Sequence, residues 1–408
     1  MTNYFKTLGL AALCTAVLLA CAADTQAQDK GAPEKAAPQK GGKGGKGVFG
    51  PKGPKSPEVN ADGTVIFRLP LPNLQKVELD GDFKERFTKG TIPMAKDEKT
   101  GAWTATVKVP PGSYQYWFIA DGFTMPDPSN THVRPASGVY KSQFEVPGTE
   151  TSWMAVRDVP HGTLHEHTYF NKDNATYRRV VIYTPPGYQD SAANAYPVLY
   201  LLHGANDFER GWTQAGRANW IMDNLIADGK AVPMIVVMPF GHATSGSTGK
   251  VPEVQTIQAA RGSKGGGGWT MEKDMLNNVI PLVEKEFRVI KDKEHRAIIG
   301  YSMGGGHSTS IGLNHPELFT YVGGMSGYTG QAGIQKALAD PAKTNKDFKL
   351  VWLGCGTDDF AIDGGRNLDK LLTSKGIHHQ WTESAGYRHD YQIWRAYLKD
   401  FAEQLFKK

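Results

Sequence analysis

The sequence predicts an α/β domain with a largely parallel sheet, preceded by a small all-β sandwich. From about residue 150, short apolar runs typical of strands alternate with longer helical stretches. Residues 58–148 instead carry short β-branched and aromatic runs separated by turn residues, without helical periodicity. A length of 408 residues suits a chain of two or three domains.

Residues 1–27 read as an export signal. Lys6 supplies the positive charge, and the apolar run from Leu8 to Ala20 is too short to span a membrane comfortably. Small residues follow, with a cleavage site at T-Q-A before Gln28. An alternative is a lipoprotein signal, since LLAC resembles a lipobox with Cys21 as the lipidated residue. We therefore expect a periplasmic or extracellular protein, with an outer-membrane lipoprotein as the alternative. The only membrane contact we expect is a lipid anchor at Cys21.

Residues 28–57 are rich in Gly, Pro, Lys and Ala and have almost no large apolar side chains. Such a segment cannot bury enough surface to offset the entropy of ordering, so we expect a disordered linker. The linker and signal also carry the excess of positive charge. The remainder, residues 58–408, has 38 basic and 38 acidic side chains. This balance gives no reason to expect a nucleic-acid partner.

The region at 58–148 contains TVIFRL, KVELD, WTATVKV and YQYWFIA, separated by turn-prone stretches such as DEKTG and PPG. Short strands at this spacing predict a β-sandwich. The one cysteine beyond the signal, Cys355, stands in the apolar run LVWLGC, so we expect a packed side chain and no internal disulfide. No spacing resembles a metal site, and we expect neither a metal nor another cofactor.

The region at 150–408 is predicted to form the α/β domain. Expected strands are 177–183, 197–203, 234–238, 295–299, 320–325, 348–354 and 379–383. Expected helices are 216–228, 273–288, 303–315, 364–375 and 391–406. Several strands are nearly continuous apolar runs, as expected when helices cover both faces of a sheet.

The stretch HRAIIGYSMGGGHS places Ser302 in a G-x-S-x-G pattern between a buried strand and a helix. Strand, sharp turn and helix are what a nucleophile elbow requires. A serine nucleophile also needs a base and a group that orients the base. Downstream, CGTDD offers Asp358 and Asp359 at the end of a strand, and His389 lies just before the last helix. The order nucleophile, acid, His is that of an α/β-hydrolase, with Asp359 and His389 as our candidates.

Oxyanion donors are expected from two backbone N–H groups. Met303 follows the nucleophile at the helix start, and Ala205 lies in LLHGAND after another predicted strand. We expect His203 in that stretch to hold the loop by local hydrogen bonds. The Gly-rich segment 261–270 lacks the features of a phosphate loop and suggests an active-site loop. Asn219 and Trp269 are further candidates for substrate contact.

From about 150 to 407 the chain resembles carbohydrate esterase family 1, which includes feruloyl and acetyl xylan esterases. The similar stretches include VPHGTLHEHTYF, YPVLYLLHG, EHRAIIGYSMGGGHS, CGTDD and HDYQIW. The resemblance implies an α/β-hydrolase fold with nucleophile Ser302, acid Asp359 and base His389. It also supports oxyanion donors at Met303 and near Ala205.

Residues 58–148 are similar to an immunoglobulin-like module of the glycogen-binding type, through DGTVIFRLPLPN, VELDGDF and GSYQYWFIADG. Its aromatic residues Trp103, Tyr116 and Trp117 either stack on sugar rings or fill the sandwich core. Signature aromatics of glycogen binders are not clearly matched, so a lid or docking role is the alternative.

These features predict an exported serine esterase that removes feruloyl or acetyl groups from an esterified plant polysaccharide or oligosaccharide. Rival functions are an enterochelin-type siderophore esterase, an acyltransferase to sugar and a non-catalytic carbohydrate-binding protein. The oligomeric state is not predicted.

Overall fold

A computed structural model describes residues 55–242 and 271–407, except Glu85, Ser137, Asn174, Ala175 and Ser191. The predicted export signal, nearly all of the predicted linker, Cys21 and Trp269 lie outside these residues. The described residues belong to one compact unit, residues 51–408.

Residues 58–146 form two antiparallel sheets. One contains β1 (Glu58–Val59), β2 (Thr64–Leu69), β6 (Trp103–Lys108) and β5 (Ala95–Lys96), in that order. The other has the order β4 (Ile92–Pro93), β3 (Val77–Gly81), β7 (Gly112–Ala120), β10 (Val139–Val146) and β9 (Val133–Ala136), and β8 (Phe123–Met125) also pairs with β7. We refer to this all-β region as the sandwich.

The core of the sandwich consists of side chains that alternate along its strands. Tyr114, Tyr116 and Phe118 of β7 are buried there with Phe67 and Phe144. Because successive side chains of a strand point to opposite faces, the residues between them project outward. The structure therefore distinguishes among the three aromatic residues that were expected either to stack on sugar rings or to fill the core. Trp103 and Tyr116 belong to the core, whereas Trp117 does not.

After the sandwich, the described residues form a single mixed sheet of eight strands. It has the order β11 (Thr163–Asn171), β12 (Thr176–Thr184), β14 (Ile235–Pro239), β13 (Val198–Leu202), β15 (Arg296–Gly300), β16 (Tyr321–Met325), β17 (Leu350–Gly356) and β18 (Gln380–Ser384). The pairs β11–β12 and β12–β14 are antiparallel, and the others are parallel. The prediction of an α/β domain with a mostly parallel sheet is confirmed.

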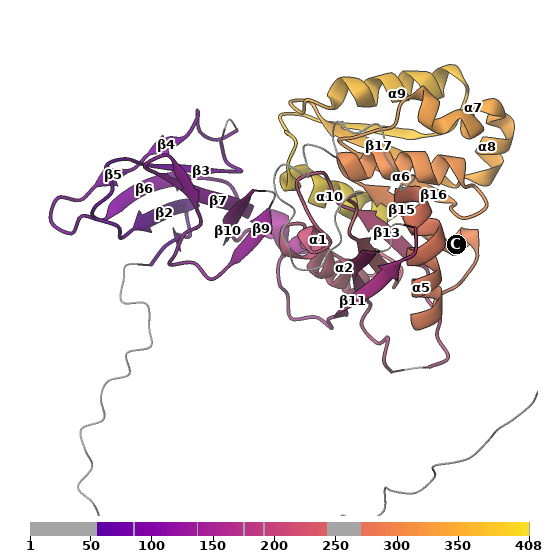
Figure 1. The fold of residues 1–408 in the computed structure, drawn as a ribbon, viewed down its shortest axis with the longest axis horizontal. Helices are drawn as coiled ribbons and strands as arrows, with labels where there is room; N and C mark the ends of the chain where they lie inside the picture. Colours follow the sequence, from indigo (N-terminus) through magenta and orange to yellow (C-terminus); the bar gives the residue numbers. More distant parts are fainter. Residues whose placement is uncertain are drawn as a thin grey trace, which may run out of the picture. The chain divides into compact units, whose positions relative to one another are not determined.

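Helices cover both faces of this sheet (Figure 1). They are α1 (Gly211–Gln214), α2 (Ala218–Ala227), α4 (Met271–Asp274), α5 (Ile280–Glu286), α6 (Met303–Asn314), α7 (Gln335–Ala339), α8 (Pro341–Asp347), α9 (Ile362–Ser374) and α10 (Tyr391–Ala402). Short 3-10 turns lie at Thr149–Met154, Lys293–His295 and Gln331–Ile334, and Met275–Val279 is π-helical.

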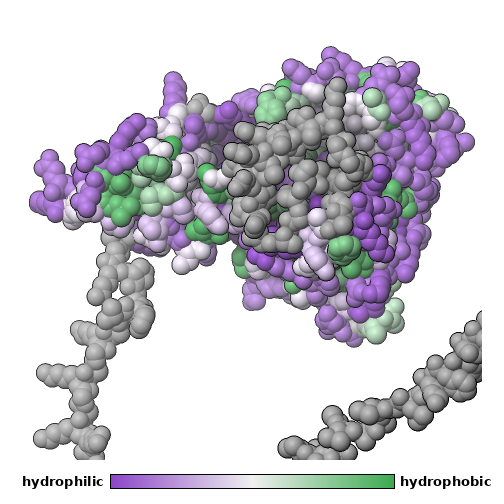
Figure 2. Space-filling view, in the orientation of Figure 1, coloured by the Kyte–Doolittle hydropathy of each residue, from purple (hydrophilic) through white to green (hydrophobic). Residues whose placement is uncertain are grey.

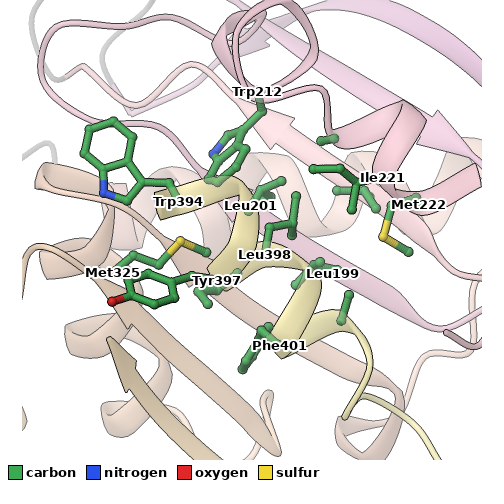
Figure 3. Packing of buried hydrophobic residues seen from close by; sticks show 14 of the residues in the cluster. Leu199, Leu201, Trp212, Ile221, Met222, Met325, Trp394, Tyr397, Leu398 and Phe401 are labelled. Atoms are coloured by element: carbon green, nitrogen blue, oxygen red, sulfur yellow. The ribbon is translucent and has the colours of Figure 1, made fainter. Parts of the chain in front are cut away.

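Strand β13 shows how the sheet is buried. Leu199 and Leu201 pack on one face with α2 and α10, as Figure 3 shows, whereas Tyr200 and Leu202 pack on the other with α5, α6 and α9. A strand buried on both faces must be apolar at every position, which explains the run VLYLL.

Several elements differ from the sequence prediction, including the short helices α1, α7 and α8, which were not expected. Strand β11 was not expected, because its sequence TLHEHTYFN is polar and largely exposed at the sheet edge. The helix expected at 273–288 is divided into α4, a π-helical segment and α5. In that segment, the amides of Asn277 and Asn278 donate hydrogen bonds to Asp173.

The face shown in Figure 2 is mostly hydrophilic over the described residues, with scattered hydrophobic side chains. No helix within 55–242 or 271–407 is both long and apolar enough to cross a membrane.

Candidate active site

Ser302 lies in a sharp turn between β15 and α6. Its backbone has φ 55° and ψ −121°, an unusual conformation for a residue with a side chain. The turn is tight enough to exclude side chains at its two glycines. A Cβ on Gly300 would lie 2.5 Å from the carbonyl oxygen of Gly304, and one on Gly304 would lie 2.6 Å from that of His203. The two glycines of the G-x-S-x-G pattern are therefore required by the packing of the backbone.

His389 is paired with one of the two candidate acids. Its Nδ1 lies 2.9 and 3.0 Å from the carboxylate oxygens of Asp359, which is fully buried in the turn after β17. The neighbouring Asp358 is exposed and accepts a hydrogen bond from Thr357. A carboxylate beside Nδ1 selects the tautomer with the proton on Nδ1, which leaves the Nε2 lone pair free to accept a proton.

The imidazole of His389 is also held by two aromatic rings. The ring of Phe360 lies 4.2 Å from it between centroids, and that of Trp394 lies 5.0 Å away in an edge-to-face arrangement. Trp394 extends from α10 at the border of the hydrophobic cluster in Figure 3. Phe360 is 80% exposed and Trp394 is buried, so the imidazole contacts one solvent-facing ring and one ring fixed in the core.

Ser302 and His389 line the same cavity, which has a volume of about 420 Å³. Ala205 and Gly204, from the loop after β13, also line it. Met303 begins α6, and the first N–H groups of a helix have no acceptor within the helix. The structure thus brings together the expected nucleophile, the acid–base pair and the loop of one expected oxyanion donor.

His203 fixes that loop, as the sequence suggested. Its Nδ1 lies 2.8 Å from the carbonyl oxygen of Gly204, and its Nε2 accepts a hydrogen bond of 2.9 Å from the N–H of Gly241. Burial lowers the pKa of His203 to about 3, so the ring stays neutral. A neutral ring can donate from one nitrogen and accept at the other, which both contacts require.

A buried network behind the cavity joins the site's parts. The carboxylate of Asp207 accepts hydrogen bonds from Tyr301 (2.8 Å), Tyr391 (2.6 Å) and Arg134 (2.8 Å). Tyr301 precedes the candidate nucleophile, and Tyr391 lies two residues after His389. Arg134 comes from β9 of the sandwich, and its guanidinium also donates a hydrogen bond to the side-chain oxygen of Gln115. One carboxylate therefore ties the nucleophile turn, the histidine loop and the sandwich together.

The sandwich also forms one wall of the cavity. Its contributions are Asp82, Gln115, Trp117, Thr124, Arg134, Ala136, Val139 and Lys141. Nothing in the sequence pattern suggested Arg134 or Lys141. Asp207 is the last residue of the stretch LLHGAND. An acidic residue next to the expected oxyanion loop could have indicated that it has a role in the site.

Asn219 is a candidate for substrate contact that the structure does not bring to the cavity. Asn219 is buried on α2 and is absent from the cavity wall, and Trp269 lies outside the described residues. Cys355 is fully buried, and burial raises the pKa of its thiol to about 12, as suits a packing residue. Within the described residues, no group of His, Cys, Asp and Glu could hold a metal ion.

Comparison with known proteins assigns the chain to a family. The family described as Putative esterase matches residues 175–407. Among curated proteins, the chain is 32% identical over 355 residues to an endo-1,4-beta-xylanase/feruloyl esterase of Xylanibacter ruminicola, covering 86% of this chain and 46% of that protein. It is 23% identical to an uncharacterized protein of Corynebacterium glutamicum, covering 57% of each. The chain spans about half the length of the curated relatives it matches.

Solved structures show the same fold. A ferulic acid esterase is 25% identical with a TM-score of 0.51, covering 60% of this chain and 96% of that one. The enterochelin esterase of Shigella flexneri has a TM-score of 0.62 at 16% identity, covering 84% of this chain and 92% of that one. At 16% identity the second likeness concerns the fold alone.

Proposed function

This chain belongs to the putative esterase family, and on that premise we propose that it is a serine carboxylic-ester hydrolase. The observation that carries the proposal is the hydrogen bond between His389 and Asp359 beside the cavity that Ser302 lines. A buried carboxylate, an oriented imidazole and a partly exposed serine on a strained turn are the parts needed to activate a hydroxyl nucleophile.

In the proposed reaction, the Oγ atom of Ser302 attacks the carbonyl carbon of an ester while Nε2 of His389 takes the hydroxyl proton. Asp359 stabilises the resulting imidazolium. The N–H groups of Met303 and Ala205 donate hydrogen bonds to the tetrahedral oxyanion. The carbon–oxygen bond to the alcohol then breaks, and the imidazolium protonates the leaving oxygen.

The second half of the reaction repeats these roles with water. His389 removes a proton from water, which attacks the acyl-enzyme carbonyl, and collapse of the second tetrahedral intermediate releases the carboxylic acid. Ser302 regains its proton from His389. The cycle needs no metal or cofactor.

We propose feruloyl or acetyl esters of plant xylan as the substrate class. The support is the sequence identity of 32% with the xylanase/feruloyl esterase and the likeness to the ferulic acid esterase structure. Export, with residues 1–27 as the signal, belongs to the same proposal, because a polymeric plant substrate must be met outside the cytoplasm. The proposal also includes the division of the chain into two domains at about residue 150. It further includes the resemblance of residues 58–148 to a glycogen-binding-type immunoglobulin-like module.

The test compares the wild type with Ser302→Ala on methyl ferulate and p-nitrophenyl acetate. We expect the variant to lose nearly all hydrolysis, whereas equal rates for the two proteins would reject the proposal. A fluorophosphonate probe followed by mass spectrometry should label Ser302 in the wild type alone. This labelling separates a direct role as nucleophile from a general loss of folding.

A panel of acetylated and feruloylated xylo-oligosaccharides then identifies the acyl group. Transfer of the acyl group to an added sugar would favour the acyltransferase, and preference for a catechol siderophore ester would favour the enterochelin-type enzyme. Xylan binding without hydrolysis of any ester would indicate a carbohydrate-binding protein.

A further inference from the structure

The sandwich contacts the loop that carries His389 through a single cation. Arg86 lies in the loop between β3 and β4, and its guanidinium carbon is 3.7 Å from the centroid of the Tyr387 ring. Tyr387 belongs to residues 385–390, which connect β18 to α10 and which we call the histidine loop. A cation this close to an aromatic face is attracted by the electrons of the ring. The contact therefore joins the sandwich to the loop of the proposed base.

The turn that presents Arg86 is firmly attached to the sandwich. The N–H of Phe87 donates to the carbonyl oxygen of Phe83 at 2.9 Å, and Phe83 is fully buried in the sandwich core. The N–H of Asp82 donates to the carbonyl oxygen of Gln115 at 2.9 Å, and the N–H of Gln115 donates to the carboxylate of Asp82 at 3.0 Å. No described carboxylate lies within ion-pair distance of Arg86, so its guanidinium is available to the histidine loop.

Tyr387 also supports the turn that contains the proposed acid. Its carbonyl oxygen accepts a hydrogen bond of 3.0 Å from the N–H of Asp358, the residue before Asp359. A second hydrogen bond, of 2.9 Å, joins the N–H of Gly386 to the hydroxyl of Thr357. The ring of Tyr387 packs against the hydrophobic cluster that includes α10, so it is held between this cluster and the cation of the sandwich. A shift of Tyr387 would therefore disturb both the acid and the base.

The rest of the histidine loop has little support of its own. Residues 385, 386 and 388 are exposed. Burial raises the pKa of Asp390, which follows His389, and the positive charge of Arg86 opposes that rise. Arg86 thus interacts with the loop on both sides of the imidazole, through the ring of Tyr387 and through the charge of Asp390.

We propose that Arg86 is a positioning residue for His389 and acts through Tyr387. Arg86 does not line the cavity, so it acts on the loop and not on the substrate. Proton transfer depends strongly on the placement of the groups involved, and a displacement of about 1 Å can lower a rate about 100-fold. In this arrangement Arg134 supports the nucleophile side of the site through Asp207, and Arg86 supports the base side. The inference rests on the proposed function, because it concerns the same acid–base pair.

The kinetic test uses Arg86→Met, which removes the cation and keeps most of the aliphatic chain. We expect kcat to fall about tenfold on both methyl ferulate and p-nitrophenyl acetate, with KM nearly unchanged, because the base acts in the same way on every ester. The urea midpoint should change little, since a cation–aromatic contact near the surface is weak.

Lys96→Met is the matched control. The ammonium of Lys96 also lies over an aromatic ring, 5.2 Å from the centroid of Trp103, but both residues belong to the sandwich and neither lines the cavity. This variant should keep the wild-type kcat. An equal fall in both variants would overturn the inference, because the contact with the histidine loop would then have no special role.

Variants of Tyr387 test the route of the effect. Tyr387→Leu should lower kcat at least as much as Arg86→Met, and adding Arg86→Met to Tyr387→Leu should cause no further loss. Tyr387→Phe keeps the aromatic face and should retain most of the rate. Losses that add in the double variant, or an unchanged kcat in Arg86→Met, would overturn the inference.

A spectroscopic measurement separates this inference from the proposed function. The Nδ1 proton of His389, which faces Asp359, gives a downfield proton NMR signal that does not depend on turnover. In Arg86→Met this proton should exchange with solvent about tenfold faster, because the loop opens more often, whereas Lys96→Met should match the wild type. If the wild type hydrolyses neither ester and this difference persists, only the proposed function is rejected. If hydrolysis occurs and the proton exchanges equally fast in wild type and Arg86→Met, only the inference is rejected.

Discussion

The guanidinium of Arg134 donates a hydrogen bond of 2.8 Å to the carboxylate of Asp207, and each side chain is only 4% exposed. Arg134 comes from the sandwich, and Asp207 lies in the loop that carries Ala205. Asp207 also accepts hydrogen bonds from Tyr301 and Tyr391. Two charges removed from water at this depth are tolerated only as a pair. The sandwich is therefore coupled to the geometry of the candidate active site.

Replacing Arg134 with Met should leave Asp207 buried without its cation. Losing one partner of such a pair costs about 3–5 kcal/mol, so we expect a large drop in the free energy of unfolding, measured by urea denaturation. Activity on every ester should fall, because the loop of Ala205 and the turn of Ser302 share this anchor.

Arg157→Met is the control for this change. Arg157 also forms an ion pair, with Asp228, but these side chains are 32% and 26% exposed. A solvent-exposed pair contributes at most about 1 kcal/mol. Similar losses of unfolding free energy in the two variants would show that burial of the Arg134–Asp207 pair does not increase its contribution to stability.

Asp359→Asn should reduce kcat on the order of 10⁴-fold with little change in folding. An amide cannot stabilise the imidazolium and can hold the imidazole in the opposite tautomer. Asp358→Asn, one residue earlier and exposed, should keep the wild-type rate. Steady-state hydrolysis of p-nitrophenyl acetate measures both, and a larger loss in Asp358→Asn would reverse the assignment of the acid.

Gly304→Ala should disrupt the turn that carries Ser302. The added Cβ would meet the backbone oxygens of His203 and Leu202 at 2.6 and 2.7 Å, and backbone atoms there cannot move aside cheaply. We expect a loss of about 1–3 kcal/mol in unfolding free energy together with lower activity. Gly306→Ala, on the same helix, meets nothing closer than 3.8 Å. It should be neutral in both measurements, and equal damage would contradict the packing argument.

Asp390→Asn should stabilise the protein more at pH 8 than at pH 5. Burial, reinforced by the charge of Asp82, raises the pKa of Asp390 from 3.8 to about 7. Between these two values the unfolded chain loses a proton that the folded chain keeps, so the stability of the wild type falls as the pH rises. Asn removes this dependence and still caps α10, where Asp390 accepts from the N–H of Gln392.

Urea denaturation of the wild type and Asp390→Asn at both pH values measures the effect. The gain from the substitution should be nearly absent below pH 4 and complete above pH 7. A gain that is independent of pH would show that ionisation of Asp390 is not its source.

Much of the α/β domain could be predicted because its elements have strong local signals. Strands buried on both faces, such as β13 and β17, appear as continuous apolar runs. The edge strand β11 is polar and exposed, so no pattern of burial marked it. Ser302 and Asp359 were visible for a similar reason, since each follows a buried strand, whereas His389 follows the partly exposed edge strand β18 and was found from its position just before the last helix.

The sequence by itself determined the strand–turn–helix around Ser302, because the turn has no room for a side chain at positions 300 and 304 and both are glycine. It also indicated the acid–base pair through its order along the chain. Only the tertiary structure joined Arg134 to Asp207 and put Trp117 and Lys141 into the cavity of Ser302. Those partners are far apart in sequence. The sequence pattern of a strand is the same whether its outward-facing residues contact solvent or line a cavity shared with another part of the fold.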